Sequence, residues 1–121
     1  MSRARVLVVD DEPGVLSLVS KALSRRGYEV ESANHPLQAL AIVETAPPFD
    51  LVVSDVIMPQ ICGPQLVKRI TEICPGAAVV LMSGHLGCEI LPANCKYIGK
   101  PFMLPDLFRV VEQALEQGAG I

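Results

Sequence analysis

The sequence predicts an α/β fold in which one parallel β-sheet carries helices on both faces. Short apolar runs rich in branched side chains alternate along the chain with longer segments whose apolar residues recur at helical spacing. Strands that alternate with helices in this way pair in parallel and are covered on both faces, so the order predicts a doubly wound (βα)₅ sheet. The 121 residues fit one domain spanning residues 1–121, with no linker, repeat or second domain.

The first predicted strand is Val6–Val9, a continuous apolar run. Pro13 suits the first turn of a helix that continues to about Arg26, and the acids before it suit the positive end of the helix dipole. Gly27 then provides a C-terminal cap. Residues Tyr28–Ala33 alternate between apolar and polar side chains, which predicts a strand near the edge of the sheet.

A second helix is predicted over His35–Ala46, ended by the two prolines that follow. Its predicted apolar face consists of Leu37, Leu40 and Ala41. The next strand, Leu51–Asp55, is central, because its apolar run is typical of a strand buried on both faces and it ends in a single acid.

In the second half of the chain, periodicity and Pro/Gly breaks predict two more strands and two clear helices. The segment between the last two strands is the least regular and has room for a helix of only one or two turns. In chain order, the predicted elements are a helix from Gly63 to Ile73, a strand over Ala77–Met82, a short helix over Leu86–Leu91, a strand over Lys96–Gly99 and a final helix over Leu104–Leu115, with glycines fraying its end.

Composition excludes several classes of protein. No apolar run approaches the ~18 residues that span a bilayer, and the N-terminus lacks the features of a signal peptide, so we expect a soluble cytoplasmic protein with no membrane partner. A net charge of −3 with scattered basic residues argues against direct nucleic-acid binding. The four cysteines form no CxxC pair, which favours reduced, apolar thiols over a metal cage: Cys62, Cys74, Cys88 and Cys95.

Polar side chains stand at the carboxyl ends of four predicted strands, where open α/β sheets bind ligands. They are Asp10 with Asp11, Asp55, Ser83 and Lys100. Three converging carboxylates repel one another unless a cation neutralises them, and all-oxygen ligands suit Mg²⁺. Lys100 supplies a charge for phosphoryl oxygens and Ser83 a hydroxyl donor. Taken singly, each residue is also typical of a helix start, a turn or a solvated loop, so the prediction depends on their joint occurrence.

With these motifs the sequence closely resembles the receiver domain of two-component response regulators over essentially its whole length. Four segments carry the resemblance, in the order in which they follow the predicted strands. They are Val-Val-Asp10-Asp11-Glu12, Asp55-x-x-Met58-Pro59-x-x-x-Gly63, Met82-Ser83-Gly84, and Tyr97-Ile98-Gly99-Lys100-Pro101-Phe102. The resemblance implies a flavodoxin-like sheet with strand order 2-1-3-4-5.

The resemblance also implies a reaction. Asp55 would accept a phosphoryl group from the phosphohistidine of a histidine kinase or phosphotransfer protein, with Mg²⁺ as the cofactor. Asp11, Asp55 and the backbone carbonyl of Ile57 would bind the metal directly, and Asp10 would act mainly through water. Lys100 would pair with the phosphoryl group, as expected where catalysis consists of positioning and charge neutralisation. The chain would then assist its own phosphorylation and dephosphorylation without being a turnover enzyme.

The resemblance further implies a switch. Ser83 would hydrogen-bond the new phosphoryl group, and Tyr97 would rotate in response. The surface around the fourth-strand loop, the fifth strand and the final helix would then signal to an output partner. This sequence departs from the family in having Ser83 where threonine is commoner, Cys62 where an acid is usual, and a shorter interval from Ser83 to Lys100.

Two other classes remain open from the residues. One is a degenerate receiver that acts only as a protein-binding module, although such a module has no need of an intact set of acids, serine and lysine. The other is a hydrolase with an aspartyl nucleophile, whose usual first-strand motif is Asp-x-Asp, whereas here Asp10 and Asp11 are adjacent and the isolated acid is Asp55.

Overall fold

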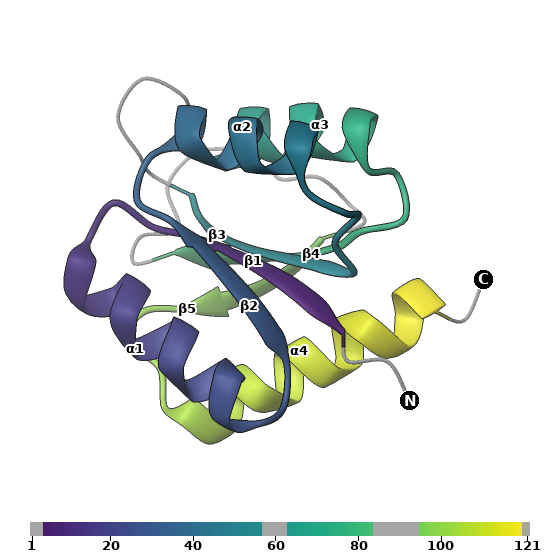
Figure 1. The fold of residues 1–121 in the computed structure, drawn as a ribbon. Coiled ribbons are helices and arrows are strands. Elements are labelled where there is room, and N and C mark those ends of the chain that lie inside the picture. The colour runs from purple at the N-terminus through teal and green to yellow at the C-terminus, as the bar shows by residue number, and fades with distance from the viewer. Residues whose placement is uncertain (1–3, 57–62, 84–94, 120–121) are drawn as a thin grey trace.

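The structure is a computed structural model, and it describes residues 4–56, 63–83 and 95–119. Five strands form one sheet in the order β2-β1-β3-β4-β5, and every neighbouring pair is parallel (Figure 1). This confirms the predicted doubly wound, flavodoxin-like fold and its strand order. The elements are β1 (Arg5–Val9), α1 (Pro13–Arg25), β2 (Glu29–Ala33), α2 (Pro36–Thr45), β3 (Leu51–Asp55), α3 (Gly63–Ile73), β4 (Ala78–Ser83), β5 (Lys96–Gly99) and α4 (Leu104–Ala119).

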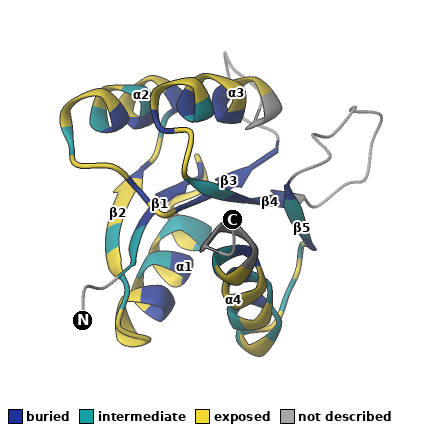
Figure 2. Cartoon of the chain, turned by 90° about the vertical axis from the view of Figure 1, so that its right-hand side faces the viewer, coloured by how far each residue is buried: buried dark blue, intermediate teal, exposed yellow. Residues whose placement is uncertain are grey.

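The helices form two layers, with α2 and α3 on one face of the sheet and α1 and α4 on the other (Figure 1). Side chains along β1 alternate between these layers. Val6 and Val8 pack with the core under α1 and α4, whereas Leu7 and Val9 pack with the core under α2 and α3. Figure 2 shows the result, a buried sheet between helices whose outer faces are exposed.

Burial distinguishes the central and edge strands as the sequence predicted. All five residues of β3 are buried, since both faces of this strand are covered. The edge strand β2 leaves Glu29, Glu31 and Ser32 exposed and buries Ala33. The central position of β3 places the carboxylate at its end, Asp55, in the middle of one edge of the sheet.

The predicted apolar face of α2 is only partly correct, because Leu40 packs against the core but Ala41 is exposed. This helix buries Pro36, Ala39 and Val43, while Leu37 is 52% exposed. The buried residues follow the same helical period with a different phase, and the small side chain of Ala39 faces the core under α2 and α3. The apolar residues of the sequence therefore predicted the helix but not the phase of its buried face.

The final helix is longer than predicted, because α4 continues past Leu115 and through Gly118 to Ala119. The described residues contain four helices. The predicted short helix over Leu86–Leu91 lies outside the described residues, so the fifth helix stays a prediction. Cys74 and Cys95 are buried and form no disulfide within the described part of the chain, as expected, whereas Cys62 and Cys88 lie outside the described residues.

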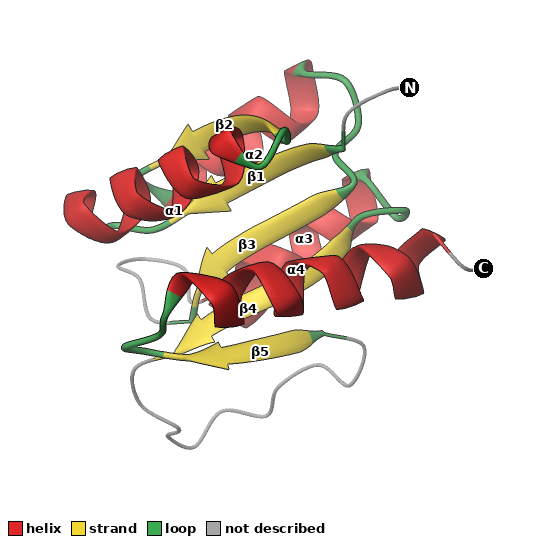
Figure 3. Ribbon diagram, turned by 90° about the horizontal axis from the view of Figure 1, so that it is seen from below, coloured by secondary structure: helices red, strands yellow, loops and turns green. Residues whose placement is uncertain are grey.

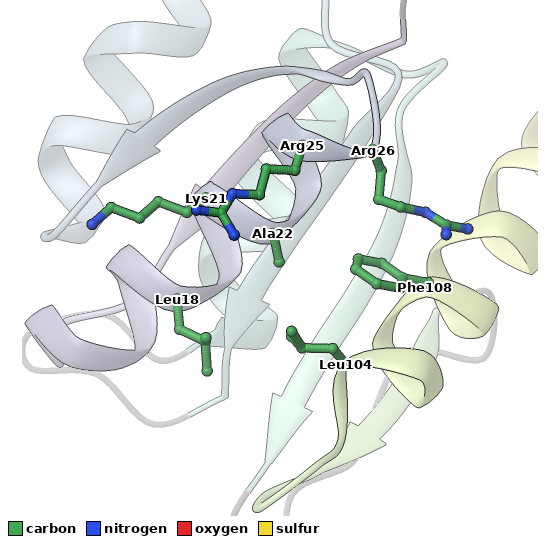
Figure 4. A pocket seen from close by; sticks show the side chains of 7 residues that line it. All are labelled: Leu18, Lys21, Ala22, Arg25, Arg26, Leu104 and Phe108. Atoms are coloured by element: carbon green, nitrogen blue, oxygen red, sulfur yellow. The ribbon is translucent and has the colours of Figure 1, made fainter.

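A groove of about 370 Å³ runs between α1 and α4 (Figure 4). We call it the α1–α4 groove. Four apolar residues and three cations line it: Leu18, Ala22, Leu104, Phe108, Lys21, Arg25 and Arg26. Among the described residues, none of the helices has the length and apolar character needed to cross a bilayer.

Candidate functional site

The carboxyl ends of the parallel strands share one edge of the sheet (Figure 3). The register aligns Asp55 with Met82 of β4, and Ser83 with Gly99 of β5. The four strand ends named in the sequence analysis therefore lie along this edge. Asp10 follows β1, Asp55 ends β3, Ser83 ends β4 and Lys100 follows β5.

Three carboxylates converge at the middle of this edge. One oxygen from each of Asp10, Asp11 and Asp55 lies within 4.8 Å of the others. Asp10 is fully buried and Asp55 is 6% exposed, whereas Asp11 is exposed. An all-oxygen donor set of this charge, with one ligand open to water, fits a hard cation such as Mg²⁺, which keeps some of its waters.

Lys100 brings a cation to the carboxylates. Its Nζ lies 3.0 Å from Oδ2 of Asp10, 3.3 Å from Oδ2 of Asp55 and 3.5 Å from Oε1 of Glu12. Burial favours the neutral amine, but hydrogen bonds and charge attraction from Asp10 and Asp55 outweigh this effect and raise the pKa of Lys100. The side chain is therefore a fixed ammonium at the centre of the edge.

Asp10 has both carboxylate oxygens engaged within the protein. Oδ1 accepts a hydrogen bond from the backbone N–H of Glu12 at 2.8 Å, and Oδ2 accepts one from Lys100. Asp11 differs, since it is exposed at the same edge. The two neighbouring acids therefore differ in exposure, and their expected roles, Asp11 as a direct metal ligand and Asp10 through water, stay predictions.

Glu12 is a further residue of the site that the sequence pattern did not indicate. It is the N-cap residue of α1, yet its side chain makes no capping hydrogen bond and lies near Lys100 instead. The signal was available, because Glu12 directly continues the pair Asp10-Asp11. That position was interpreted only as an acidic helix start.

The two predicted switch residues belong to β4 and β5. Ser83 is the last residue of β4, and its backbone is in register with Gly99, the neighbour of Lys100 in the chain. Tyr97 is half-buried on β5 and packs against a small core that includes Val56 and Leu81. Burial, and then the nearby Cys95, raise the pKa of the Tyr97 hydroxyl. Ile57, the predicted backbone ligand, lies outside the described residues.

A comparison with models of known protein families identifies the family of the chain that carries this site. The family model described as the response regulator receiver domain matches residues 6–112. The match covers all five strands except Arg5, the first residue of β1. It includes all the strand ends that form the site. The chain belongs to the response regulator receiver family.

Other receivers resemble the chain in sequence and in structure. The receiver domain of the hybrid histidine kinase CckA has a crystal structure that is 37% identical, covers 93% of this chain and 99% of that chain, and superposes with a TM-score of 0.82. A CheY-like receiver domain protein from Methanospirillum hungatei is 29% identical over 98% of both chains, with a TM-score of 0.90.

The curated relatives are of different lengths. The chain is 37% identical to the sensor kinase CckA of Brucella abortus over 94% of its own length, but it spans only 13% of that protein. It is 29% identical to the response regulator receiver protein CpdR of the same organism, covering 92% of this chain and 96% of CpdR. Receivers similar to this chain therefore occur both within longer proteins and as nearly whole proteins.

Membership of the receiver family decides between the classes that the residues left open. Receiver domains of response regulators are generally not a family of catalytic enzymes, so the match does not support the hydrolase. The degenerate module has no support either, since the acids and the lysine of the motif are present and come together.

Proposed function

We propose that this receiver accepts a phosphoryl group on Asp55 from the phosphohistidine of a histidine kinase or phosphotransfer protein. The observation that carries the proposal is the placement of Asp55. It ends the central strand β3, with the ammonium of Lys100 3.3 Å from its carboxylate and Asp10 and Asp11 beside it. A phosphoryl group that bonds to this carboxylate gains a cation on its oxygens without any large movement of the backbone.

The transfer forms an oxygen–phosphorus bond from Asp55 and breaks the phosphorus–nitrogen bond of the donor, whose imidazole leaves with the electron pair. Lys100 holds a positive charge where negative charge gathers on the phosphoryl oxygens. Mg²⁺, when bound, would be held by Asp11, Asp55 and the Ile57 carbonyl, with Asp10 acting through water, and it would neutralise the carboxylates and the phosphoryl charge. The same groups would assist hydrolysis of the acyl phosphate.

Asp55 is favoured over its neighbours as the acceptor. Asp10 is fully buried, and its two oxygens accept hydrogen bonds from the Glu12 N–H and from Lys100, so this carboxylate already anchors the start of α1 and the lysine. Asp11 is exposed, and it lies one residue farther from the end of β1 than Asp10. Asp55 combines a fixed backbone with a carboxylate in contact with Lys100.

We further propose that Ser83 and Tyr97 transmit the change. A phosphoryl group at the end of β3 adds strong hydrogen-bond acceptors beside the end of β4, and Val56 N–H already donates to the Met82 carbonyl at 2.9 Å across this boundary. Movement of Ser83 toward the phosphoryl group would bias the half-buried Tyr97 and the surface formed by β5 and α4.

Amide NMR spectra of the protein with Mg²⁺ and beryllofluoride, a mimic of the phosphoryl group, test this switch. We expect shifts at Tyr97 and along α4 in addition to those around Asp55. Shifts confined to the loops that carry Asp10, Asp11 and Asp55 would contradict the switch while leaving the phosphoacceptor role intact.

The wider setting follows from the same proposal. Residues 1–121 act as one receiver domain in the cytoplasm, together with a sensor kinase or phosphotransfer protein and an unidentified output protein or domain. Some relatives are named as DNA-binding regulators, but the chain spans only 25% of one of them, NtrC of Azospirillum brasilense. With its net charge of −3, this chain is not proposed to contact nucleic acid itself.

Phosphorylation by acetyl phosphate with Mg²⁺, followed by intact mass measurement, tests the acceptor. The wild type should gain one phosphate, Asp55→Asn none, and Asp50→Asn one. Asp50 is a matched control because it is an exposed aspartate at the opposite end of the same strand region. One stoichiometric phosphate on Asp55→Asn would refute the assignment.

A further inference from the structure

The ammonium of Lys100 has three carboxylate neighbours, and they are not equivalent. Asp10 and Asp55 belong to the cluster whose oxygens lie within 4.8 Å of one another, whereas Glu12 does not. Asp10 and Asp55 are buried, while the Glu12 side chain is 64% exposed. Glu12 is therefore the outer acceptor of a cation whose other two acceptors lie inside the site.

The backbone of Glu12 is fixed although its side chain is exposed. Its N–H donates to Asp10, and its carbonyl accepts the N–H of Leu16 in the first turn of α1 at 3.0 Å. A residue at this N-cap position ordinarily uses a side-chain oxygen to accept an N–H of the helix. The Glu12 carboxylate makes no such bond and lies 3.5 Å from Lys100 Nζ.

We propose that Glu12 is a positioning residue that holds Lys100 in its resting place and competes with an incoming phosphoryl group for it. An ammonium has three N–H donors, and the resting site offers three carboxylates to them. A phosphoryl group on Asp55 needs at least one of these donors. Asp10 and Asp55 are also proposed to serve the metal, so the contact with Glu12 is the one that has no other use in the reaction.

The negative charge of Glu12 acts in the same direction. A phosphodonor is anionic, and the carboxylate of Glu12 lies at the exposed side of the cation that must receive it. Both the competition for Lys100 and the repulsion therefore weaken phosphoryl binding in the wild type. Glu12 would set how readily the site responds to small anionic donors. This inference rests on the proposed function, since it assumes that a phosphoryl group binds beside Lys100.

Replacing Glu12 by glutamine tests the proposal. Beryllofluoride affinity at fixed Mg²⁺ is measured by amide NMR titration, and the phosphorylation rate is measured with acetyl phosphate. We expect Glu12→Gln to tighten beryllofluoride binding and to raise the rate by about two- to fivefold, the factor that about 0.4 to 1 kcal/mol gives for an exposed ion pair. Structural damage to the site would instead weaken beryllofluoride binding. The direction of the change in affinity therefore distinguishes loss of competition from damage.

Glu12→Asp separates the contact from the charge. The shorter side chain keeps the carboxylate but is a favoured N-cap, which would turn it toward the first turn of α1 and away from Lys100. If Glu12 acts through Lys100, Glu12→Asp should show most of the gain seen with Glu12→Gln. Wild-type affinity in Glu12→Asp together with a gain in Glu12→Gln would overturn the competition and leave only repulsion.

Glu44→Gln is the matched control. Glu44 is an exposed glutamate on α2, and its replacement by glutamine changes the net charge of the protein by the same amount as Glu12→Gln. The control should behave as the wild type. Equal values for Glu12→Gln and Glu44→Gln would overturn the inference. Failure of the wild type itself to bind beryllofluoride or to be phosphorylated would instead refute the proposed function, so the two failures are distinguishable.

Discussion

The molecule carries its charges in two regions that differ in burial. At the edge cluster, formed by Asp10, Asp11, Glu12, Asp55 and Lys100, the central ion pairs are largely removed from water. In the α1–α4 groove, the cations lie on the surface around an apolar floor (Figure 4). Coulomb interactions are weakly screened in the first region and strongly screened in the second.

This difference indicates which charges contribute most to the free energy of folding. The edge cluster holds four carboxylates and one ammonium. The stability of the folded protein therefore depends on Lys100 and, by our proposal, on a metal, because these cations offset the repulsion between the carboxylates. The cation Arg26 of the groove pairs with Glu112 at 2.8 Å, but both side chains are about half exposed. An exposed pair contributes little to folding.

The largest effect is expected at the centre of the edge cluster. Replacing Lys100 by methionine leaves carboxylates near one another without their cation, and removal of one partner from a buried pair costs several kcal/mol. We expect a loss of about 2–4 kcal/mol in the free energy of unfolding at pH 7 without divalent ions. Urea denaturation measures it, and added Mg²⁺ should restore part of the loss. A loss of unfolding free energy smaller than that expected for an exposed ion pair would contradict the distinction between the edge cluster and the α1–α4 groove.

The pH dependence of the same pair has a definite sign. Because the pKa of Lys100 is raised on folding, its contribution is fully present below the unfolded value of about 10.5 and is lost as pH rises through the higher folded value. The difference in unfolding free energy between the wild type and Lys100→Met should therefore be constant from neutral pH to about pH 10 and shrink above it. A difference that shrinks already near pH 8 would exclude Lys100 as its source.

An intermediate effect is expected at Asp11, an exposed acid of the edge cluster. Asp11→Asn removes like-charge repulsion and a proposed metal ligand together. Without metal, the variant should be slightly more stable than the wild type, by less than about 1 kcal/mol. In millimolar Mg²⁺ the wild type should gain about 1 kcal/mol by mass action, and the variant should lose most of that gain. Thermal melts with and without Mg²⁺ measure both, and an undiminished Mg²⁺ shift in Asp11→Asn would exclude Asp11 as a ligand.

The sequence predicted the strands and the strand-end residues better than the helix faces. Strand ends are marked by an abrupt change from apolar to charged residues, as at Val9–Asp10, so their positions can be assigned without three-dimensional information. A helix face depends on the phase of packing, which α2 sets by burying Ala39 and exposing Leu37. Size alone does not reveal that phase.

The contact of Glu12 with Lys100 was not predicted, for a similar reason. An acid before a helix is expected to interact with the helix dipole and the first-turn N–H groups, and nothing local distinguishes it from an acid that contacts a distant lysine. The contact with Lys100 joins residues 88 positions apart, so it exists only once β1 and β5 lie in the same sheet. The convergence of Asp10 and Lys100 was easier to predict, because the strand ends of any doubly wound sheet come together at one edge.

The smallest effect is expected at the groove. Arg26 pairs with Glu112 and also lies over the Phe108 ring, 4.4 Å from its centroid, so it links the end of α1 to α4 by two exposed contacts. Glu112→Gln removes the ion pair and leaves the ring contact, and it should cost about 0.2–1 kcal/mol at low salt. Urea denaturation at low and high salt measures the cost, which should fall as salt is added. Glu116→Gln, on the same helix and also exposed, is the charge-matched control and should change little. A cost for Glu112→Gln that equals that of Lys100→Met, or that is unaffected by salt, would show that the groove holds its charges as the edge cluster does, and the distinction between the two regions would fail.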